Sequence, residues 1–77
     1  MSEADAMLDA SGLNCPLPVL KTRKSLAALK AGQTLQVIST DPGSKADMNA
    51  FAEATGHRLL QSSEEDGRFV FLIEKTS

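Results

Sequence analysis

The sequence contains no tryptophan or tyrosine, and only one cysteine and one histidine among its 77 residues. A single cysteine cannot form an internal disulfide, which indicates a free thiol in a reducing compartment. One cysteine and one histidine also fall short of the four ligands that a closed zinc site needs. We therefore expect neither a bound metal nor a cofactor.

Aromatic residues and positive charge are also scarce. The three phenylalanines offer little surface on which bases could stack, and the net charge is -2 at pH 7. A negative balance of this kind argues against bulk affinity for nucleic acid. We expect partners other than DNA or RNA.

Long apolar runs and targeting segments are absent as well. No run approaches the roughly 18–20 apolar residues that cross a bilayer. The acidic start, Met1–Asp5, lacks the basic segment and apolar centre of a signal peptide. We expect one cytoplasmic domain over residues 1–77 with no membrane segment, in which residues 1–5 are disordered.

Apolar periodicity and turn formers divide the chain into six elements. Strands are predicted over residues 7–10, 34–40, 57–63 and 68–75, and helices over 16–30 and from the 41–44 turn to 55. The last strand is apolar on both faces, which predicts an interior position, and Asp66-Gly67 before it predicts a hairpin. Two helices can cover only one face of four strands. We therefore expect an α+β fold of order βαβαββ, a two-layer α/β sandwich with a mixed sheet and both helices on one face.

The first predicted helix has one apolar face and is otherwise basic. Val19, Leu26 and Leu29 share a side, with Leu20 and Ala27 beside them. Gly32 is expected to end this helix.

The second predicted helix has an apolar face and a glycine stop. The face consists of residues spaced i, i+3, i+4 and i+7, namely Met48, Phe51, Ala52 and Thr55, and Gly56 follows them. Its start allows two interpretations that remain open. Either Asp41 caps the helix with Pro42 in the first position, or Ser44 forms a capping pair with Asp47.

The only cysteine, Cys15, stands in the loop Gly12–Pro18 at the start of the first helix. A helix N-terminus carries partial positive charge and free amides, and residues 10–40 hold four basic and no acidic side chains. Both features favour the thiolate, which is the reactive form of cysteine. Pro16 and Pro18 restrict the backbone, so we expect a reactive thiol held at a rigid helix tip.

These residues also have ordinary structural interpretations. A lone cysteine in a small domain is often a buried apolar residue. Lys21, Arg23 and Lys24 form either a solvated surface or a docking site for a partner. His57 is interpreted as an exposed residue at a strand start; its lack of any link to Cys15 argues against hydrolysis by a Cys–His pair.

A Cys-Pro-x-Pro motif at residues 15–18 stands among further residues that match one known family. Leu8-Asp9 and Gly12-Leu13 precede the motif. The later matches are Gly32, the strand Leu35–Val37, the turn Asp41–Gly43, Asp47 and Gly56-His57. Over roughly residues 7–75, the chain resembles the TusA/SirA-like sulfur-carrier family.

The resemblance implies a fold like the C-terminal domain of translation initiation factor three. It also implies that Cys15 carries sulfur as a persulfide, with Gly12, Pro16 and Pro18 supporting the motif. The sulfur would come from a cysteine desulfurase or a rhodanese-type donor and pass to a downstream sulfur-relay acceptor protein. The pathways served by such carriers are tRNA 2-thiouridine synthesis, molybdenum-cofactor supply and cytoplasmic sulfur oxidation.

On this interpretation the protein is a monomeric carrier of the sulfurtransferase type, not an enzyme with its own turnover. Two other functions remain open. A thiol redox sensor would need an external thiol, because the chain has no second cysteine. An RNA-binding module is suggested by the fold analogy and the basic helix, although the net charge and the few aromatics oppose it.

Overall fold

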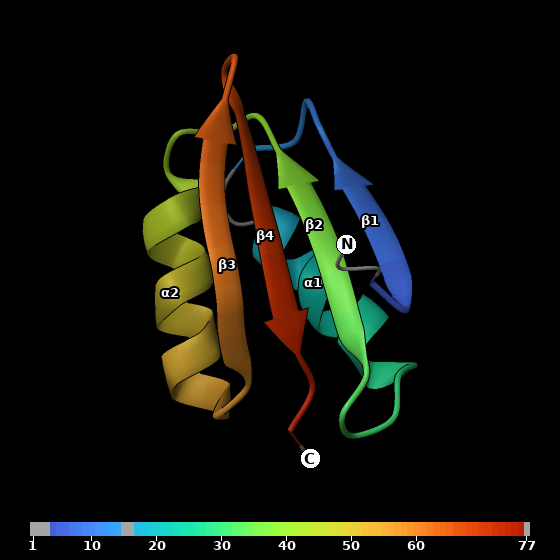
Figure 1. Ribbon diagram of the computed structural model, residues 1–77. Coiled ribbons are helices and arrows are strands. Elements are labelled where there is room, and N and C mark those ends of the chain that lie inside the picture. The colour runs from blue at the N-terminus through green and yellow to red at the C-terminus, as the bar shows by residue number, and fades with distance from the viewer. Residues whose placement is uncertain (1–3, 15–16, 77) are drawn as a thin grey trace.

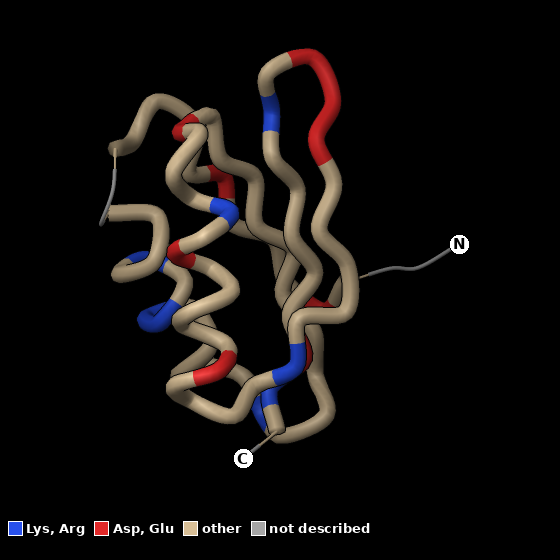
Figure 2. The backbone as a smooth tube through the Cα atoms, turned by 90° about the vertical axis from the view of Figure 1, so that its left-hand side faces the viewer, with Lys and Arg blue, Asp and Glu red and all other residues tan. Residues whose placement is uncertain are grey.

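The computed structural model describes residues 4–14 and 17–76. The structure contains one sheet of four strands, which Figure 1 shows face on, and Figure 2 shows both helices packed on the same side of the sheet. The elements in chain order are β1 (Ala6–Ala10), α1 (Leu17–Ala27), β2 (Thr34–Ser39), α2 (Ser44–Thr55), β3 (Arg58–Glu65) and β4 (Arg68–Glu74). The predicted α+β sandwich of order βαβαββ is confirmed.

The sheet is mixed, with strand order β1-β2-β4-β3. β1 runs parallel to β2, whereas β4 is antiparallel to both of its neighbours. The interior position predicted for β4 is therefore confirmed. Asp66 and Gly67, with φ of 51° and 77°, form the two-residue turn between β3 and β4, since this kind of hairpin requires positive φ at both positions.

The core lies between the sheet and the two helices. Side chains alternate along β2 and β4, so every second residue points toward the helices. The buried apolar cluster consists of Leu26 from α1, Met48 and Phe51 from α2, and Leu35, Val37, Phe69, Phe71 and Ile73 from the sheet. The other face of the sheet is only partly covered, and Met7 there is 68% exposed.

The first helix ends earlier than the sequence predicts. It stops at Ala27 instead of Lys30, and the next two amides form i→i−3 hydrogen bonds of 3.2 and 3.0 Å. The Lys75 ammonium donates to the carbonyl of Leu29 at 2.7 Å, so a tertiary contact satisfies this end of the helix. Gly32 lies in the following turn and donates its amide to Lys75 at 2.6 Å. The prediction that Gly32 ends the helix is wrong, because α1 already stops at Ala27 and Gly32 lies in the turn beyond it.

The buried side of α1 also differs from the prediction. Pro18, Thr22 and Leu26 face the sheet, whereas Leu20 is 50% exposed. Two residues along a helix correspond to about 200° around its axis, so burying Thr22 turns Leu20 outward. Ala27 is exposed too. The predicted inward orientation of Leu20 and Ala27 is wrong.

Neither of the two capping interpretations is right, because α2 begins at Ser44, its N-cap is Gly43, and no side chain caps the helix. The Asp41 carboxylate accepts a hydrogen bond from the Gly43 amide at 3.2 Å. The Ser44 hydroxyl donates to the Asp41 carbonyl at 2.7 Å and serves as no cap for the helix amides. At the other end, Gly56 adopts φ 81° as predicted for the stop.

Two smaller differences concern single residues. Thr55, predicted on the buried face of α2, is exposed, and its hydroxyl donates to the Phe51 carbonyl at 2.7 Å. Asp5, expected in a disordered terminus, is bound to β2, because its carboxylate accepts the Thr34 amide at 2.8 Å. Within the described residues, no helix is long and apolar enough to cross a membrane.

Candidate functional site

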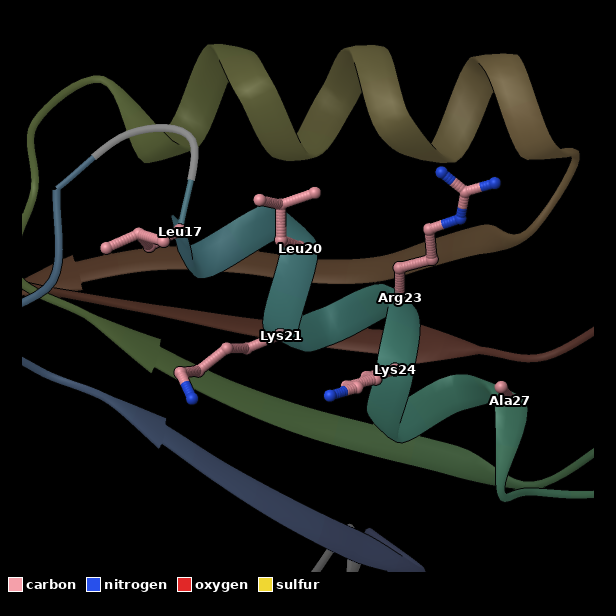
Figure 3. Close-up of a pocket in the computed structure, with 6 residues that line it drawn as sticks. All are labelled: Leu17, Leu20, Lys21, Arg23, Lys24 and Ala27. Carbon is pink, nitrogen blue, oxygen red and sulfur yellow. The ribbon is translucent and has the colours of Figure 1, made fainter.

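The loop that leads to Cys15 lies where two strands end and two helices begin. β1 and β2 are parallel, and Figure 3 shows that α1 and α2 start at the same end of the molecule. The β1–α1 and β2–α2 loops are therefore neighbours. The Gly12 amide donates to the Thr40 hydroxyl at 2.8 Å, which ties the first loop to the end of β2.

A tight turn redirects the chain after β1. The Leu13 amide donates to the Ala10 carbonyl at 3.2 Å, and Gly12 adopts φ 81°. A Cβ at Gly12 would meet no atom within 4 Å, so the left-handed backbone, not lack of space, favours glycine. The sequence prediction that Gly12 supports the motif remains a prediction; its conformation gives the residue a definite backbone role.

Asp9 fixes the beginning of this turn. Its carboxylate accepts the Ser11 amide at 3.0 Å. Hydrogen bonds from the Ser11 side chain and amide hold the pKa of Asp9 below its ordinary value, and the Arg68 charge acts in the same direction. Asp9 therefore stays ionised and keeps its contact with the turn.

The first turn of α1 is held from both sides. The Leu17 amide donates to the Asn14 carbonyl at 2.8 Å. Inside the helix, the buried Thr22 hydroxyl donates to the Pro18 carbonyl at 2.7 Å, and Pro18 itself is buried. Cys15 and Pro16, the central residues of the motif, lie outside the described residues. The chain is thus anchored immediately before and after them.

The three basic residues predicted from the sequence lie together on the outer side of α1. The three side chains, labelled in Figure 3, line a shallow hollow. The volume of this hollow is about 510 Å³. Leucine side chains at 17 and 20 share this surface and are 44% and 50% exposed. The sequence did not indicate that Leu17 and Leu20 are surface residues. Only the burial of Thr22 could have indicated that these leucines point outward.

The only histidine takes no part in this region. His57 is half-buried at the C-terminal end of α2, the end opposite to the start of α1 in Figure 3. Its Nδ1 accepts the Thr76 amide at 3.3 Å, and its ring centroid lies 6.1 Å from that of Phe51. The predicted full exposure of His57 is therefore wrong, because the ring packs on α2.

Metal binding finds no support in the part of the chain that is described. Residues 4–14 and 17–76 contain no group of three or more histidine, aspartate or glutamate side chains that could hold an ion.

Comparison with known proteins decides the family. The sequence profile described as "Sulfurtransferase TusA" matches residues 6–75. The chain belongs to the TusA family. The resemblance inferred from the Cys-Pro-x-Pro motif and its flanking residues is confirmed.

Two curated members of the TusA family are similar over nearly their whole length. "Sulfur carrier protein TusA" of Allochromatium vinosum is 57% identical over 76 residues, covering 99% of this chain and 100% of the relative. The protein of the same name from Pseudomonas putida is 46% identical over 71 residues, covering 92% of this chain and 89% of the relative.

A solved structure supports the fold. The SirA-like protein from Desulfitobacterium hafniense superposes with a TM-score of 0.82 at 30% identity, covering 94% of this chain and 99% of that one. The mixed sheet with two helices on one face is therefore an architecture shared with a SirA-like protein.

Proposed function

We propose that this protein is a sulfur carrier that holds sulfane sulfur as a persulfide on Cys15. Membership of the TusA family, with relatives named sulfur carrier proteins, is the observation that supports this function. Cys15 is the only cysteine in the chain, so it is the only residue that can carry a persulfide. The whole of residues 1–77 acts as one carrier domain in this proposal.

The transfer is a substitution at sulfur. The Cys15 thiolate attacks the outer sulfur of a persulfide on the donor cysteine; the donor S–S bond breaks, and the donor thiolate leaves. A new S–S bond forms on Cys15, so one sulfur atom moves and the pair of proteins shows no net oxidation. The acceptor cysteine repeats the same step on Cys15, and no metal or nucleotide is consumed.

The residues around Cys15 prepare it for this exchange in two ways. The positive end of α1 favours the thiolate over the thiol, because free amides at a helix start stabilise negative charge. The anchors at Gly12–Thr40 and Pro18–Thr22 hold the two ends of the loop, which limits how far the motif can move. A donor enzyme then meets a preorganised target.

Donor and acceptor are proposed to be proteins, a cysteine desulfurase or rhodanese-type donor and a relay protein. Lys21, Arg23 and Lys24 steer acidic partners toward the loop, since complementary charge raises association rates. Replacing all three by glutamate is expected to lower the transfer rate and flatten its salt dependence. Replacement of three exposed basic residues outside α1 by glutamate, namely Lys45, Arg58 and Arg68, is the control with the same change of net charge. Equal rates for the two triple variants would remove the steering role.

The carrier function is tested by intact-protein mass after incubation with a cysteine desulfurase and L-cysteine. The proposal predicts the addition of one sulfur atom, lost on treatment with dithiothreitol and absent in Cys15→Ser. Sulfinic acid has nearly the same nominal mass but resists the reductant, so reversibility is the deciding result. If neither a desulfurase, a rhodanese nor inorganic polysulfide loads the protein, the carrier proposal fails.

A further inference from the structure

Thr40, the first residue after β2, carries the hydroxyl that joins the two loops before the helices. This hydroxyl accepts a hydrogen bond from the Gly12 amide at 2.8 Å, although the two residues lie 28 positions apart in the chain. The bond from the Leu13 amide to the Ala10 carbonyl shapes the turn after β1 but connects it only to the end of that strand. The contact with Thr40 therefore fixes the turn relative to the β2–α2 loop.

Thr40 is itself held by its neighbours in the chain. The hydroxyl of the buried Ser39 accepts the Asp41 amide at 3.2 Å. The Asp41 carbonyl in turn accepts both the amide and the hydroxyl of Ser44, at 3.0 and 2.7 Å. Because these bonds tie the segment to the end of β2 and the start of α2, the Thr40 hydroxyl offers the Gly12 amide an acceptor in a fixed place.

The turn at Gly12 sets the direction in which the chain leaves β1 toward Cys15. Gly12 adopts φ 81° and precedes Cys15 by three residues, a span of at most about 10 Å. A rotation of the Gly12 peptide would carry the following residues with it. The bond between Gly12 and Thr40 therefore constrains the approach of the chain to the cysteine, and small displacements of a reacting group are costly.

A contact of the same kind exists at the other end of β2. Thr34, the first residue of the strand, accepts the Asp5 amide through its hydroxyl at 3.3 Å, and these two residues are 29 positions apart. Figure 1 shows the start of β2 at the end of the sheet opposite to the β1–α1 and β2–α2 loops. The two threonines thus make equivalent bonds to the chain before and after β1, but only the bond of Thr40 involves the loop that contains the cysteine.

We propose that Thr40 is a positioning residue for sulfur transfer, whose hydroxyl, acting through the Gly12 amide, sets the reactivity of Cys15 toward every donor and acceptor. The inference rests on the proposed carrier function and adds a residue outside the motif on which both loading and release of sulfur depend. A hydroxyl is uncharged, so Thr40 acts by keeping the thiolate at the helix start, where free amides stabilise it. Since the effect belongs to the carrier itself, it extends to small reagents that need no docking surface.

The deciding variant is Thr40→Val, which replaces the hydroxyl by a methyl group of similar size. Thr34→Val makes the same replacement at the other end of β2 and is the matched control, whereas Thr40→Ser retains the hydroxyl. The rate of Cys15 alkylation by iodoacetamide is measured as a function of pH. We expect Thr40→Val to react about two- to fivefold more slowly at neutral pH, because one hydrogen bond no longer favours the reactive conformation, and its pH profile to move upward. Thr34→Val and Thr40→Ser should remain close to the wild type.

Sulfur transfer is measured with small reagents, so that protein docking plays no part. The Cys15 thiolate takes one sulfur atom from inorganic polysulfide, and the polysulfide shortened by one sulfur leaves. Cyanide then attacks the outer sulfur of the persulfide; the S–S bond breaks, thiocyanate forms and the Cys15 thiolate is released. Both rates should fall in Thr40→Val by a factor similar to that of alkylation.

The controls separate this inference from the carrier proposal. Equal rates of alkylation and loading in Thr40→Val and Thr34→Val would overturn the positioning role while leaving the carrier function intact. Rates as low in Thr40→Ser as in Thr40→Val would also overturn it, because the hydroxyl would not be the cause. Exchange of the Gly12 amide proton, measured by NMR, should accelerate in Thr40→Val alone, since only this variant loses the bond between the loops. A wild-type protein that no donor loads would instead contradict the carrier function, and the alkylation rates would still test Thr40.

Discussion

The two helices lie side by side on one sheet, yet they differ in the apolar side chains that they leave exposed. α2 buries Met48, Phe51 and Ala52, and its outward positions are polar or small. α1 buries Pro18 and Leu26 together with the polar Thr22, and it exposes two leucines. α2 also carries both signs of charge, whereas the outward charges of α1 are all positive.

The difference shows that α1 leaves more apolar side-chain surface in contact with solvent than α2 does. α2 follows the pattern that stabilises a two-layer fold, with apolar residues inward and polar residues outward. α1 gives up part of that stabilisation in the residues that follow the cysteine motif. The comparison can be tested by changing equivalent features of the two helices and of the loops before them.

Truncating the core residue of α2 should have the largest effect on stability. Met48 is completely buried, so Met48→Ala is expected to lower the free energy of unfolding by about 2–5 kcal/mol. Leu20→Ala on α1 should change it by less than about 0.5 kcal/mol, because the side chain is already half in water. Urea denaturation followed by circular dichroism measures both values. Similar losses in the two variants would mean that Leu20 contributes to packing and would remove the contrast between the helices.

The loops before the two helices should differ in their tolerance of alanine. Gly12 adopts φ 81°, so Gly12→Ala is expected to cost about 1–2 kcal/mol, the penalty for a left-handed alanine. Gly43 has φ -74° and room for a Cβ, with Asp41 at 3.7 Å, so Gly43→Ala should cost less than about 0.5 kcal/mol. Chemical denaturation of both variants tests this.

A second substitution at the first glycine isolates the cause. Gly12→Asn should recover part of the loss, because asparagine tolerates left-handed backbone better than alanine does. If alanine and asparagine are equally costly, the left-handed backbone angle does not account for the loss.

Replacing the buried threonine of α1 should have a small net effect. Thr22→Val removes a hydrogen bond worth about 1 kcal/mol and buries a methyl group worth about 0.8 kcal/mol. The free energy of unfolding should therefore stay within about 1 kcal/mol of the wild type. The rate of Cys15 alkylation by iodoacetamide provides a second readout. A faster rate at unchanged stability would show that Thr22 positions the first turn, whereas a loss well above 1 kcal/mol would show that the hydroxyl is essential to the core.

Much of this fold could be predicted, because in most elements the spacing of apolar residues in the sequence matches the secondary structure that forms. The alternation in β2, the two apolar faces of β4 and the Asp66-Gly67 turn each depend on neighbouring residues, so local rules identify them. The end of α1 could not be predicted in this way. It depends on Lys75, which lies 46 residues from Leu29 in the chain and donates to its carbonyl.

The family could be predicted from the sequence, the reactive thiol at Cys15 stays a prediction, and the surface of the candidate site could not be predicted. The sequence alone indicated a thiol at a helix start and a basic helix, and the family confirms the type of protein. The outward turn of Leu20 was missed, because Leu20 and Ala27 adjoin the Val19–Leu26 stripe and leucine is normally buried. Only the three-dimensional packing shows that Thr22 takes the inward position.

The smallest expected effect is on the pH dependence of the turn before α1. Asp9 has a pKa below the ordinary 3.8 because Ser11 donates to it, so its contribution to stability is complete above pH 3.8. The contribution is lost as the pH falls through the lowered value, since protonation removes the charge that Ser11 and Arg68 stabilise. Unfolding of the wild type and Asp9→Asn should therefore differ at neutral pH and converge in acid. A difference between the two proteins that stays constant with pH would show that Asp9 acts only through its shape.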